Sequence, residues 1–352
     1  MAARTKELLA APDLDAEYDA GFVAASARAQ EAVARTPDRV SGKPLQRPYG
    51  AEIRVGTASW TDSTMTRGGV FYPRGTSTAE ERLRYYASQF STVEVDASYY
   101  SLPDRNTVAL WAERTPDDFV FHVKAHALMT GQPTEVRRLP QDLVDLLPPA
   151  LANKQKVYDK DLPLELLEAV WTHFIRALEP LQRNGKLGGI LLQYPRWFIP
   201  SPQNRHFLAE SARRLDGISA TVEFRHQSWF ATERAAELTL GLLRELGLTH
   251  VIVDGPQGLA SSIPPVPGVT TPELAMVRLH GRRSHTWEAP NVPTVERYRY
   301  LYSRRQLEHS MLLIEQAATE ATRTIVFFNN CYGNYGSTNA REMIELLSRP
   351  TG

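Results

Sequence analysis

The chain is poor in cysteine and has no long apolar run. Cys331 is the single cysteine in 352 residues, which excludes an internal disulfide and a cysteine-based zinc site. No apolar run approaches the roughly 18 residues that a membrane helix needs. The N-terminus has no basic segment followed by an apolar stretch, and acids at Glu7 and Asp13 come too early for a transit peptide. We therefore expect a cytoplasmic protein without a membrane partner.

A net charge and a nucleotide fingerprint are also missing. The 40 basic and 40 acidic residues cancel, so the overall charge gives no support for nucleic acid as a partner, although a local basic patch would still permit it. No glycine-rich phosphate fingerprint follows the first predicted strand. The sequence thus names no nucleotide cofactor, and the cofactor stays unknown.

What recurs in the chain is an apolar strand followed by an amphipathic helix. Eight short runs rich in Val, Ile and Phe predict strands at 53–59, 92–98, 119–126, 188–194, 220–225, 249–254, 275–280 and 324–329. Helical spacing is found at 78–90, 104–115, 163–184, 203–215, 232–246, 303–320 and roughly 337–348. Eight such units in about 300 residues predict a TIM-type (β/α)8 barrel. A doubly wound open sheet is the alternative architecture.

Three segments depart from this repeat. Residues 1–50 are rich in alanine, with one marginal helix near 24–35 and a linker rich in proline and glycine, and we interpret them as an N-terminal helical extension. Residues 51–352 are then a single barrel domain with an insert at about 127–162. The sixth unit has no clear helix, because 255–272 is rich in glycine and proline.

Ionisable residues alternate with apolar ones on several predicted strands. Glu94 and Asp96 share a strand face, as do His122, Lys124 and His126, and the same holds for Glu223 with Arg225. In a closed barrel these faces meet in the lumen, where charges are costly unless they are paired or used. We expect Glu94, Lys124 and Glu223 to be the catalytic set, because carboxylates and a desolvated lysine suit acid–base chemistry.

Other residues near the strand ends are candidates for substrate binding. They are Asp96, Tyr100, His122, Gln193, Arg225, His226, Arg278, His280, Arg282, Asn329 and Asn330. The loops 281–287 and 329–336 combine glycines with arginines at the place where barrels often bind phosphate. Aromatic side chains just past the strand ends could stack on a sugar or a base; they are Trp60, Tyr99, Tyr100, Trp229 and Trp287.

Alternatives remain for the same residues. The lumen charges could form an internal salt-bridge network, for example Glu94 with Lys124 and Glu223 with Arg225 or Arg278. Lys124 could form a Schiff base, and Cys331 could be a nucleophile. A divalent metal could be bound by His122, His126, His280, Glu94, Glu223 and Asp254. Lys124 and Arg225 would oppose that cation and no HExxH spacing supports it, so we assign no metal ligands.

The motifs at the strand ends also carry a resemblance to a known family. They are GTASW (56–60), Phe71-Tyr72-Pro73, VEVDASYYSLP (93–103), DDFVFHVKA (117–125), LLQYP (191–195), VEFRHQSW (222–229), RLHGR (278–282), RYRYLYS (297–303) and FFNNCYGNYGSTNA (327–340). In this order they resemble the domain of unknown function 72 family, the YecE-like proteins. The resemblance implies a TIM-type barrel and no established activity. In the family pattern Asn is usual where Asp96 stands.

Two classes of function follow from these residues. The first is an enzyme for a small, phosphorylated or sugar-like anion; hydrolase, lyase and isomerase chemistry are all open. The second is a barrel that binds a ligand or nucleic acid without turnover. A metal-dependent hydrolase, similar to endonuclease IV by fold alone, is a weaker alternative.

Overall fold

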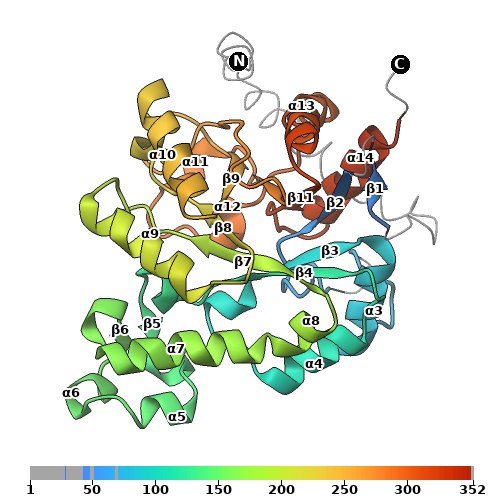
Figure 1. Cartoon of the computed structure of the whole chain (residues 1–352). Coiled ribbons are helices and arrows are strands. Elements are labelled where there is room, and N and C mark those ends of the chain that lie inside the picture. Colours follow the sequence, from blue (N-terminus) through green and yellow to red (C-terminus); the bar gives the residue numbers. More distant parts are fainter. Residues whose placement is uncertain (1–27, 29–42, 48–50, 68–69, 350–352) are drawn as a thin grey trace.

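Eight parallel strands form the centre of the molecule (Figure 1). The computed structural model describes residues 28, 43–47, 51–67 and 70–349. The strands are β2 (Glu52–Thr57), β3 (Thr92–Val95), β4 (Val120–Lys124), β7 (Leu187–Gln193), β8 (Ala220–Glu223), β9 (Thr249–Asp254), β10 (Ala275–Leu279) and β11 (Arg323–Phe328). They pair in the order β2-β11-β10-β9-β8-β7-β4-β3. Each of the eight predicted strands is present.

The sheet curls until its first and last parallel strands, β2 and β3, lie side by side. No backbone pairing joins these two among the residues that the structure describes. Instead the Tyr86 hydroxyl accepts a hydrogen bond from Thr57 N (2.9 Å) and donates one to Thr92 O (3.2 Å). A Cβ on Gly56 would lie 2.1 Å from Thr92 O, so only glycine permits this approach. In an open doubly wound sheet the outermost strands would not meet, and the TIM-type barrel is therefore confirmed.

Helices cover the outside of the curled sheet (Figure 1). They are α3 (Ala79–Gln89), α4 (Arg105–Glu113), α7 (Leu164–Ala177), α8 (Glu179–Arg183), α9 (Pro202–Arg214), α10 (Glu233–Glu245), α13 (Arg304–Glu320) and α14 (Tyr335–Leu347). The helix predicted over 163–184 is divided at Leu178, where Pro180 occupies the first turn of α8. No long helix follows β9 within 255–272, as the sequence predicts.

Side chains fix several helix starts. Thr78 and Glu81 form a reciprocal capping box at α3, and Asp104 accepts a hydrogen bond from Thr107 N (2.9 Å) at α4. Thr232 accepts from Ala235 N (3.1 Å) at α10. Ser, Thr and Asp side chains are the usual caps because they satisfy the free N–H groups of a first helical turn.

The segment after β4 has short elements of its own. A two-stranded antiparallel sheet joins β5 (Thr134–Glu135) to β6 (Lys156–Val157), with α5 (Gln141–Val144) and α6 (Pro149–Ala152) between them. Short 3-10 helices lie at Ala127–Thr130, Val136–Arg138 and Asp159–Asp161. Loop helices α11 (Ser284–Trp287) and α12 (Thr294–Arg297) follow β10.

The N-terminal extension is described only in part. Strand β1 (Leu45–Gln46) adds to β2 in the antiparallel sense. Arg28 pairs with Glu342 of α14 (3.1 Å). The remainder of the helix predicted near 24–35 and the end of the linker at 48–50 lie outside the described residues, so the domain boundary stays a prediction. Across the part of the chain that the structure describes, none of the helices has the length and apolar character needed to cross a membrane.

Candidate active site

A buried ion-pair network occupies the lumen near the carboxyl ends of the strands. Arg278 of β10 holds Glu94 of β3 through two hydrogen bonds, from Nε to Oε2 (2.8 Å) and from Nη2 to Oε1 (2.7 Å). Its Nη1 donates to Glu223 of β8. All three residues are at most 1% exposed. The two glutamates predicted to be catalytic therefore lie together, but as ligands of one arginine.

Glu223 has further partners. Its Oε1 lies 2.7 Å from Arg225 Nε, accepts a hydrogen bond from Gln193 Nε2 (2.7 Å) and lies 3.2 Å from His280 Nε2. Burial alone would raise the pKa of this carboxyl, but the charges of Arg278 and Arg225 outweigh it and hold the pKa well below the usual 4.5. A carboxylate with all of these donors is a poor general acid or base.

Lys124 at the end of β4 is differently placed. Its Nζ donates to Gln193 Oε1 (2.8 Å) and lies 4.5 Å from the centroid of the Tyr99 ring. The residue is half-buried. Burial lowers the pKa of the amino group to about 8, and nearby Arg278 lowers it as well, whereas Glu94 and Asp96 act in the opposite direction. No carboxylate of the described residues lies within ion-pair distance of Nζ, so the amine is not locked in a salt bridge.

Asp96 stands beside Lys124, just after β3 ends. The strand stops at Val95 because Ser98 Oγ donates to Val95 O (2.9 Å) and Lys124 O (2.6 Å), which begins a 3-10 turn at Ala97–Tyr99. Burial raises the pKa of the Asp96 carboxyl to about 6, with Lys124 lowering it and Glu94 raising it. Both protonation states of Asp96 are therefore accessible near neutral pH.

Arg225 provides a cation next to this pair. Its guanidinium carbon lies 5.0 Å from the centre of the Trp287 ring, and Nη2 donates to Tyr298 Oη (3.2 Å). The side chain is 13% exposed, and Nη1 makes no hydrogen bond to any residue that the structure describes. A cation with a free donor in an aromatic setting can hold a carboxylate or phosphate.

His280 and Asn329 complete the polar layer. His280 is fully buried on β10, and its Nδ1 lies 2.8 Å from Asn329 Nδ2 at the end of β11. Burial lowers the pKa of His280 to about 3, so the imidazole is neutral at physiological pH. Of the predicted residues, the structure brings together Glu94, Asp96, Lys124, Gln193, Glu223, Arg225, Arg278, His280 and Asn329.

Other predicted residues do not converge on this layer. Arg282 forms a bidentate salt bridge with Asp254, with Nε–Oδ1 at 2.9 Å and Nη2–Oδ2 at 2.5 Å. Asn330 is fully buried and donates to Tyr300 O (2.8 Å). His226 bonds the Ser228 hydroxyl (2.7 Å) and caps its own loop.

Tyr100 and His122 flank the layer without joining its hydrogen bonds. Tyr100 is 49% exposed on the rim. His122 lies fully buried in the lumen, against Phe327, with neither ring nitrogen hydrogen-bonded. Burial lowers the pKa of His122 to about 3. In the glycine-containing loops, Gly281 N donates to Tyr302 Oη (2.8 Å) and Gly333 N to Thr64 Oγ1 (2.7 Å), so neither amide is free for an anion.

The residues considered for a metal do not form one ligand set: Glu94, Glu223 and His280 are bound around Arg278, and His122, His126 and Asp254 have other surroundings. His126 accepts a hydrogen bond from Leu128 N (3.4 Å), and Asp254 accepts from Arg282, Tyr302 and Ser310. Throughout the described ranges no three His, Cys, Asp or Glu side chains are grouped as a cation would require. Burial raises the pKa of the Cys331 thiol well above its usual value, which disfavours the nucleophilic thiolate.

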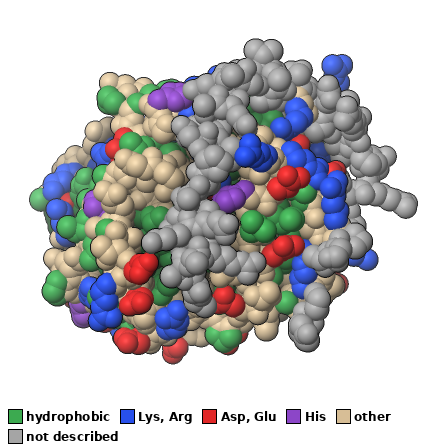
Figure 2. Space-filling model, turned by 90° about the horizontal axis from the view of Figure 1, so that it is seen from above, with side chains coloured by type: hydrophobic (Ala, Val, Ile, Leu, Met, Phe, Trp, Pro, Cys, Tyr) green, Lys and Arg blue, Asp and Glu red, His purple; other side chains and the backbone are tan. Residues whose placement is uncertain are grey.

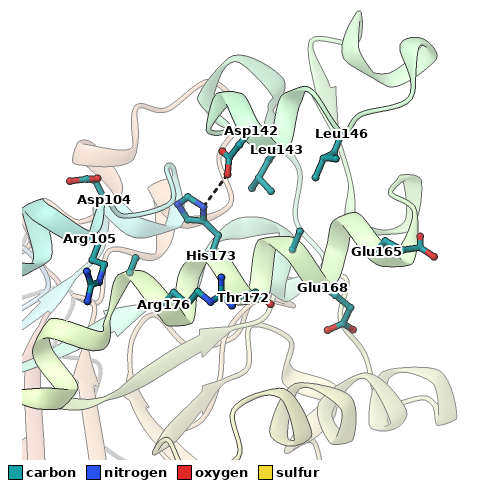
Figure 3. Close-up of a pocket in the computed structure, with 12 residues that line it drawn as sticks. Asp104, Arg105, Asp142, Leu143, Leu146, Glu165, Glu168, Thr172, His173 and Arg176 are labelled. Atoms are coloured by element: carbon teal, nitrogen blue, oxygen red, sulfur yellow. Dashed lines mark ion pairs between the residues drawn. The ribbon is translucent and has the colours of Figure 1, made fainter.

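A hollow of about 550 Å³ lies outside the barrel, between α4, α5 and α7 (Figure 3). Its charged residues are largely satisfied: His173 lies 3.9 Å from Asp142, Arg105 pairs with Glu179 (2.9 Å), and Glu168 pairs with Arg214. Apart from the His173–Asp142 contact, these partners are contributed from beyond the hollow. Three of its charged groups are thus already engaged, in contrast to the Lys124 amine.

Two residues of the site were not singled out in the sequence, Tyr298 and Gln132. Tyr298 bonds Arg225, and Tyr99, expected to stack on a ligand, lies under the Lys124 amine. Gln132, at the start of the insert, accepts from Tyr99 Oη (2.9 Å) and donates to Gln193 O (3.0 Å). Tyr99 and Tyr298 belong to conspicuous aromatic runs, but Gln132 follows a glycine in a loop and no pattern marks it.

The fold and the site define a TIM-type barrel with a charged lumen, at whose polar end the Lys124 amine has no carboxylate partner among the described residues. The chain belongs to the family described as "Protein of unknown function DUF72", whose model matches residues 54–351. It is 29% identical over 299 residues to the UPF0759 protein YunF of Bacillus subtilis, covering 84% of this chain and 94% of that protein.

Further relatives agree with this assignment. The UPF0759 protein YecE of Escherichia coli K12 is 28% identical over 205 residues, which are 57% of this chain and 59% of that protein. A crystal structure of a DUF72 family protein from Thermotoga maritima superposes with a TM-score of 0.66 at 29% identity, covering 84% of this chain and 99% of that one. Neither name states an activity.

Proposed function

We propose that the protein is an enzyme for a small anionic carbonyl compound and that Lys124 is its reactive base. The observation that supports this most directly is the half-buried Lys124 amine, which is hydrogen-bonded to an amide oxygen instead of a carboxylate. Structural lysines inside proteins are normally paired. An unpaired one beside a raised-pKa carboxyl is typical of a functional site.

The lowered pKa makes the amine usable at neutral pH. With a pKa of about 8, about one tenth of the molecules have a neutral Lys124 at pH 7, against less than about one in a thousand for an ordinary lysine. A neutral amine can remove a proton next to a carbonyl, or attack the carbonyl carbon to form a Schiff base.

Asp96 supplies the complementary proton transfer. With a pKa of about 6, its carboxyl can protonate a carbonyl oxygen and recover the proton later in the cycle. The family's usual Asn would not titrate at this position. Arg225, with its free Nη1, holds the carboxylate or phosphate of the substrate. The ion-pair network of Glu94, Glu223 and Arg278 then positions Arg225 and the amides around Lys124. The two glutamates thus have a positioning role in place of the catalytic role expected from the sequence.

Solvent exchange tests this proposal. The protein is incubated in deuterated buffer with pyruvate, oxaloacetate, dihydroxyacetone phosphate or glyceraldehyde 3-phosphate, and deuterium next to the carbonyl is measured by NMR. Both roles of Lys124 labilise that hydrogen. Added borohydride separates them, because only a Schiff base leaves a reduced adduct on Lys124 in the intact mass. Exchange at the rate of buffer alone with every compound in this set would contradict the proposal.

A matched control exists in the same chain. Lys160 is exposed and stacks 5.5 Å from the Tyr158 ring centre, much as Lys124 stacks on Tyr99, but it lies in the insert. Lys124→Met should abolish exchange and adduct formation, whereas Lys160→Met should change neither. Equal losses in the two variants would point to non-specific amine chemistry.

A barrel that binds nucleic acid without turnover is less well supported. Basic and acidic side chains are interspersed on the face in Figure 2, and the formal net charge is zero. Location in a reducing cytoplasm fits the single cysteine and remains part of the proposal.

A further inference from the structure

The carboxylate of Glu223 fixes the direction of the hydrogen bonds around it. As an ionised carboxylate, Glu223 can only accept, so Gln193, His280 and the two arginines must all donate to it. Glu223 is fully buried, so its carboxylate cannot exchange these partners for water. Because the atom facing Glu223 must be a donor, the direction in which each neighbouring amide or imidazole points its remaining polar atom is also fixed.

Gln193 illustrates the effect. Its Nε2 is bound to Glu223 Oε1 (2.7 Å), so its Oε1 faces Lys124 Nζ (2.8 Å). The amide thus presents an acceptor to the amine, which can be satisfied by either protonation state of Lys124, since both have N–H donors.

The hydrogen bond to Glu223 also fixes how His280 and Asn329 are oriented. His280 Nε2 lies 3.2 Å from Glu223 Oε1 and 3.5 Å from Arg278 Nη1. The shorter contact is to a carboxylate, which can only accept, so Nε2 bears the hydrogen, and because the imidazole is neutral Nδ1 is an acceptor. The group 2.8 Å from Nδ1 must then be the Asn329 NH₂ donor. The opposite tautomer would set a lone pair against the carboxylate, and a flipped Asn329 amide would set an oxygen against Nδ1.

The remaining atom of Asn329 is its Oδ1. It bonds to none of the residues that the structure describes, yet it is not among their buried unsatisfied atoms, so it reaches solvent at the half-buried end of β11. An acceptor oxygen fixed in this way attracts a hydroxyl or amino group and repels a second acceptor.

We infer that Asn329 is a specificity-determining residue that accepts a hydrogen bond from a hydroxyl or amino group of the substrate, with His280 as the positioning residue that orients it. The substrate class is narrowed to small anionic carbonyl compounds that also have such a donor. This rests on the proposed function for the anion and carbonyl, whereas the orientation of Asn329 rests on its hydrogen bond to His280 and on the neutral state of that buried ring.

The first arm of the test measures the tautomer. In protein labelled with ¹⁵N-histidine, His280 should be the neutral Nε2–H form between pH 5 and 8, with His280→Gln used for assignment. In Asn329→Asp the carboxylate can no longer donate to Nδ1, so His280 should gain a proton there and show imidazolium or Nδ1–H signals. An Nδ1–H tautomer or an imidazolium in the unsubstituted protein would overturn the inference.

The second arm measures recognition in two matched pairs, hydroxypyruvate against pyruvate and 3-hydroxypropyl phosphate against propyl phosphate. In at least one pair the hydroxylated compound should bind about tenfold more tightly, the weight of a single hydrogen bond. Asn329→Leu should reduce that ratio to about one, whereas Asn329→Asp, which retains an acceptor oxygen, should preserve it.

The outcomes separate the two proposals. Equal affinities within both pairs overturn the role of Asn329. No binding of any of the four compounds, together with an Nε2–H His280, overturns the anion subsite of the proposed function and leaves the orientation of Asn329 supported.

Discussion

Replacing Arg278 by methionine should destabilise the protein through one particular carboxylate. Glu223 would keep Arg225, Gln193 and His280 as partners. Glu94 would keep none, because both of its hydrogen bonds come from Arg278. Removing one member of a buried ion pair costs about 3–5 kcal/mol, mostly through the charge left behind.

The magnitude can be checked by urea unfolding followed by tryptophan fluorescence. With an m-value of about 3 kcal/mol/M, the midpoint should fall by about 1–1.7 M. Adding Glu94→Gln to Arg278→Met should restore at least about 2 kcal/mol, because the unpaired charge is gone. Adding Glu223→Gln instead should restore less.

Arg54 offers a control at the other end of the lumen. It is 6% exposed and pairs with Glu52 (3.0 Å), but Glu52 also pairs with Arg323 (2.5 Å). Arg54→Met leaves no carboxylate alone and should cost only about 1–2 kcal/mol. A loss under about 1 kcal/mol for Arg278→Met, or no rescue by Glu94→Gln, would refute this account of the network.

Three further predictions concern stability. His122→Leu should leave the unfolding free energy unchanged or raise it by about 1–3 kcal/mol, because two orphaned ring nitrogens disappear; a clear loss in a urea titration would indicate a partner for the ring. Gly56→Ala should lower the unfolding free energy by about 3 kcal/mol or more through the clash across β2 and β3. Gly241→Ala, in an open helical position, should be neutral or stabilising. Similar urea midpoints for the two variants would contradict the close approach of β2 and β3. The third prediction is acid sensitivity, and it rests on four buried histidines with lowered pKa values: His122, His126, His250 and His280. Around and below pH 6.5 the unfolded chain binds protons that the folded chain does not, so stability should be full above about pH 7.5 and about 5 kcal/mol lower at pH 5.5. A flat unfolding free energy over this interval would contradict the neutral histidines.

The strand–helix repeat is readable because its signals are local. Val93 and Val95 face one side of β3 and Glu94 the other, and this alternation survives in any register. The ends of the strands are less predictable. Alternation over 92–98 predicts a strand that includes Asp96, whereas the Ser98 hydroxyl takes up the Val95 carbonyl and ends β3 early.

Partners across the lumen could be predicted only in part: the pairing of Glu223 with Arg225 and Arg278, which the sequence offered as an alternative, is present, but that of Glu94 is not the one expected. Glu94, Glu223 and Arg278 were all expected to face inward, but their pairing depends on how the strands are staggered around the barrel. The expected partner of Glu94 was Lys124, and the structure assigns Arg278 instead. Beyond the strand ends, alternation no longer fixes direction, which is why Arg282 turns to Asp254 and Asn330 to the Tyr300 carbonyl while Asn329 faces His280.

The central claim is that Lys124 is a base of lowered pKa, and its titration tests this most directly. The ¹³Cε resonance of Lys124, assigned with Lys124→Arg in ¹³C-lysine-labelled protein, can be followed between pH 6 and 11. The account predicts a midpoint near pH 8, well separated from the exposed lysines such as Lys160. A midpoint near the ordinary value of about 10.5 would contradict it.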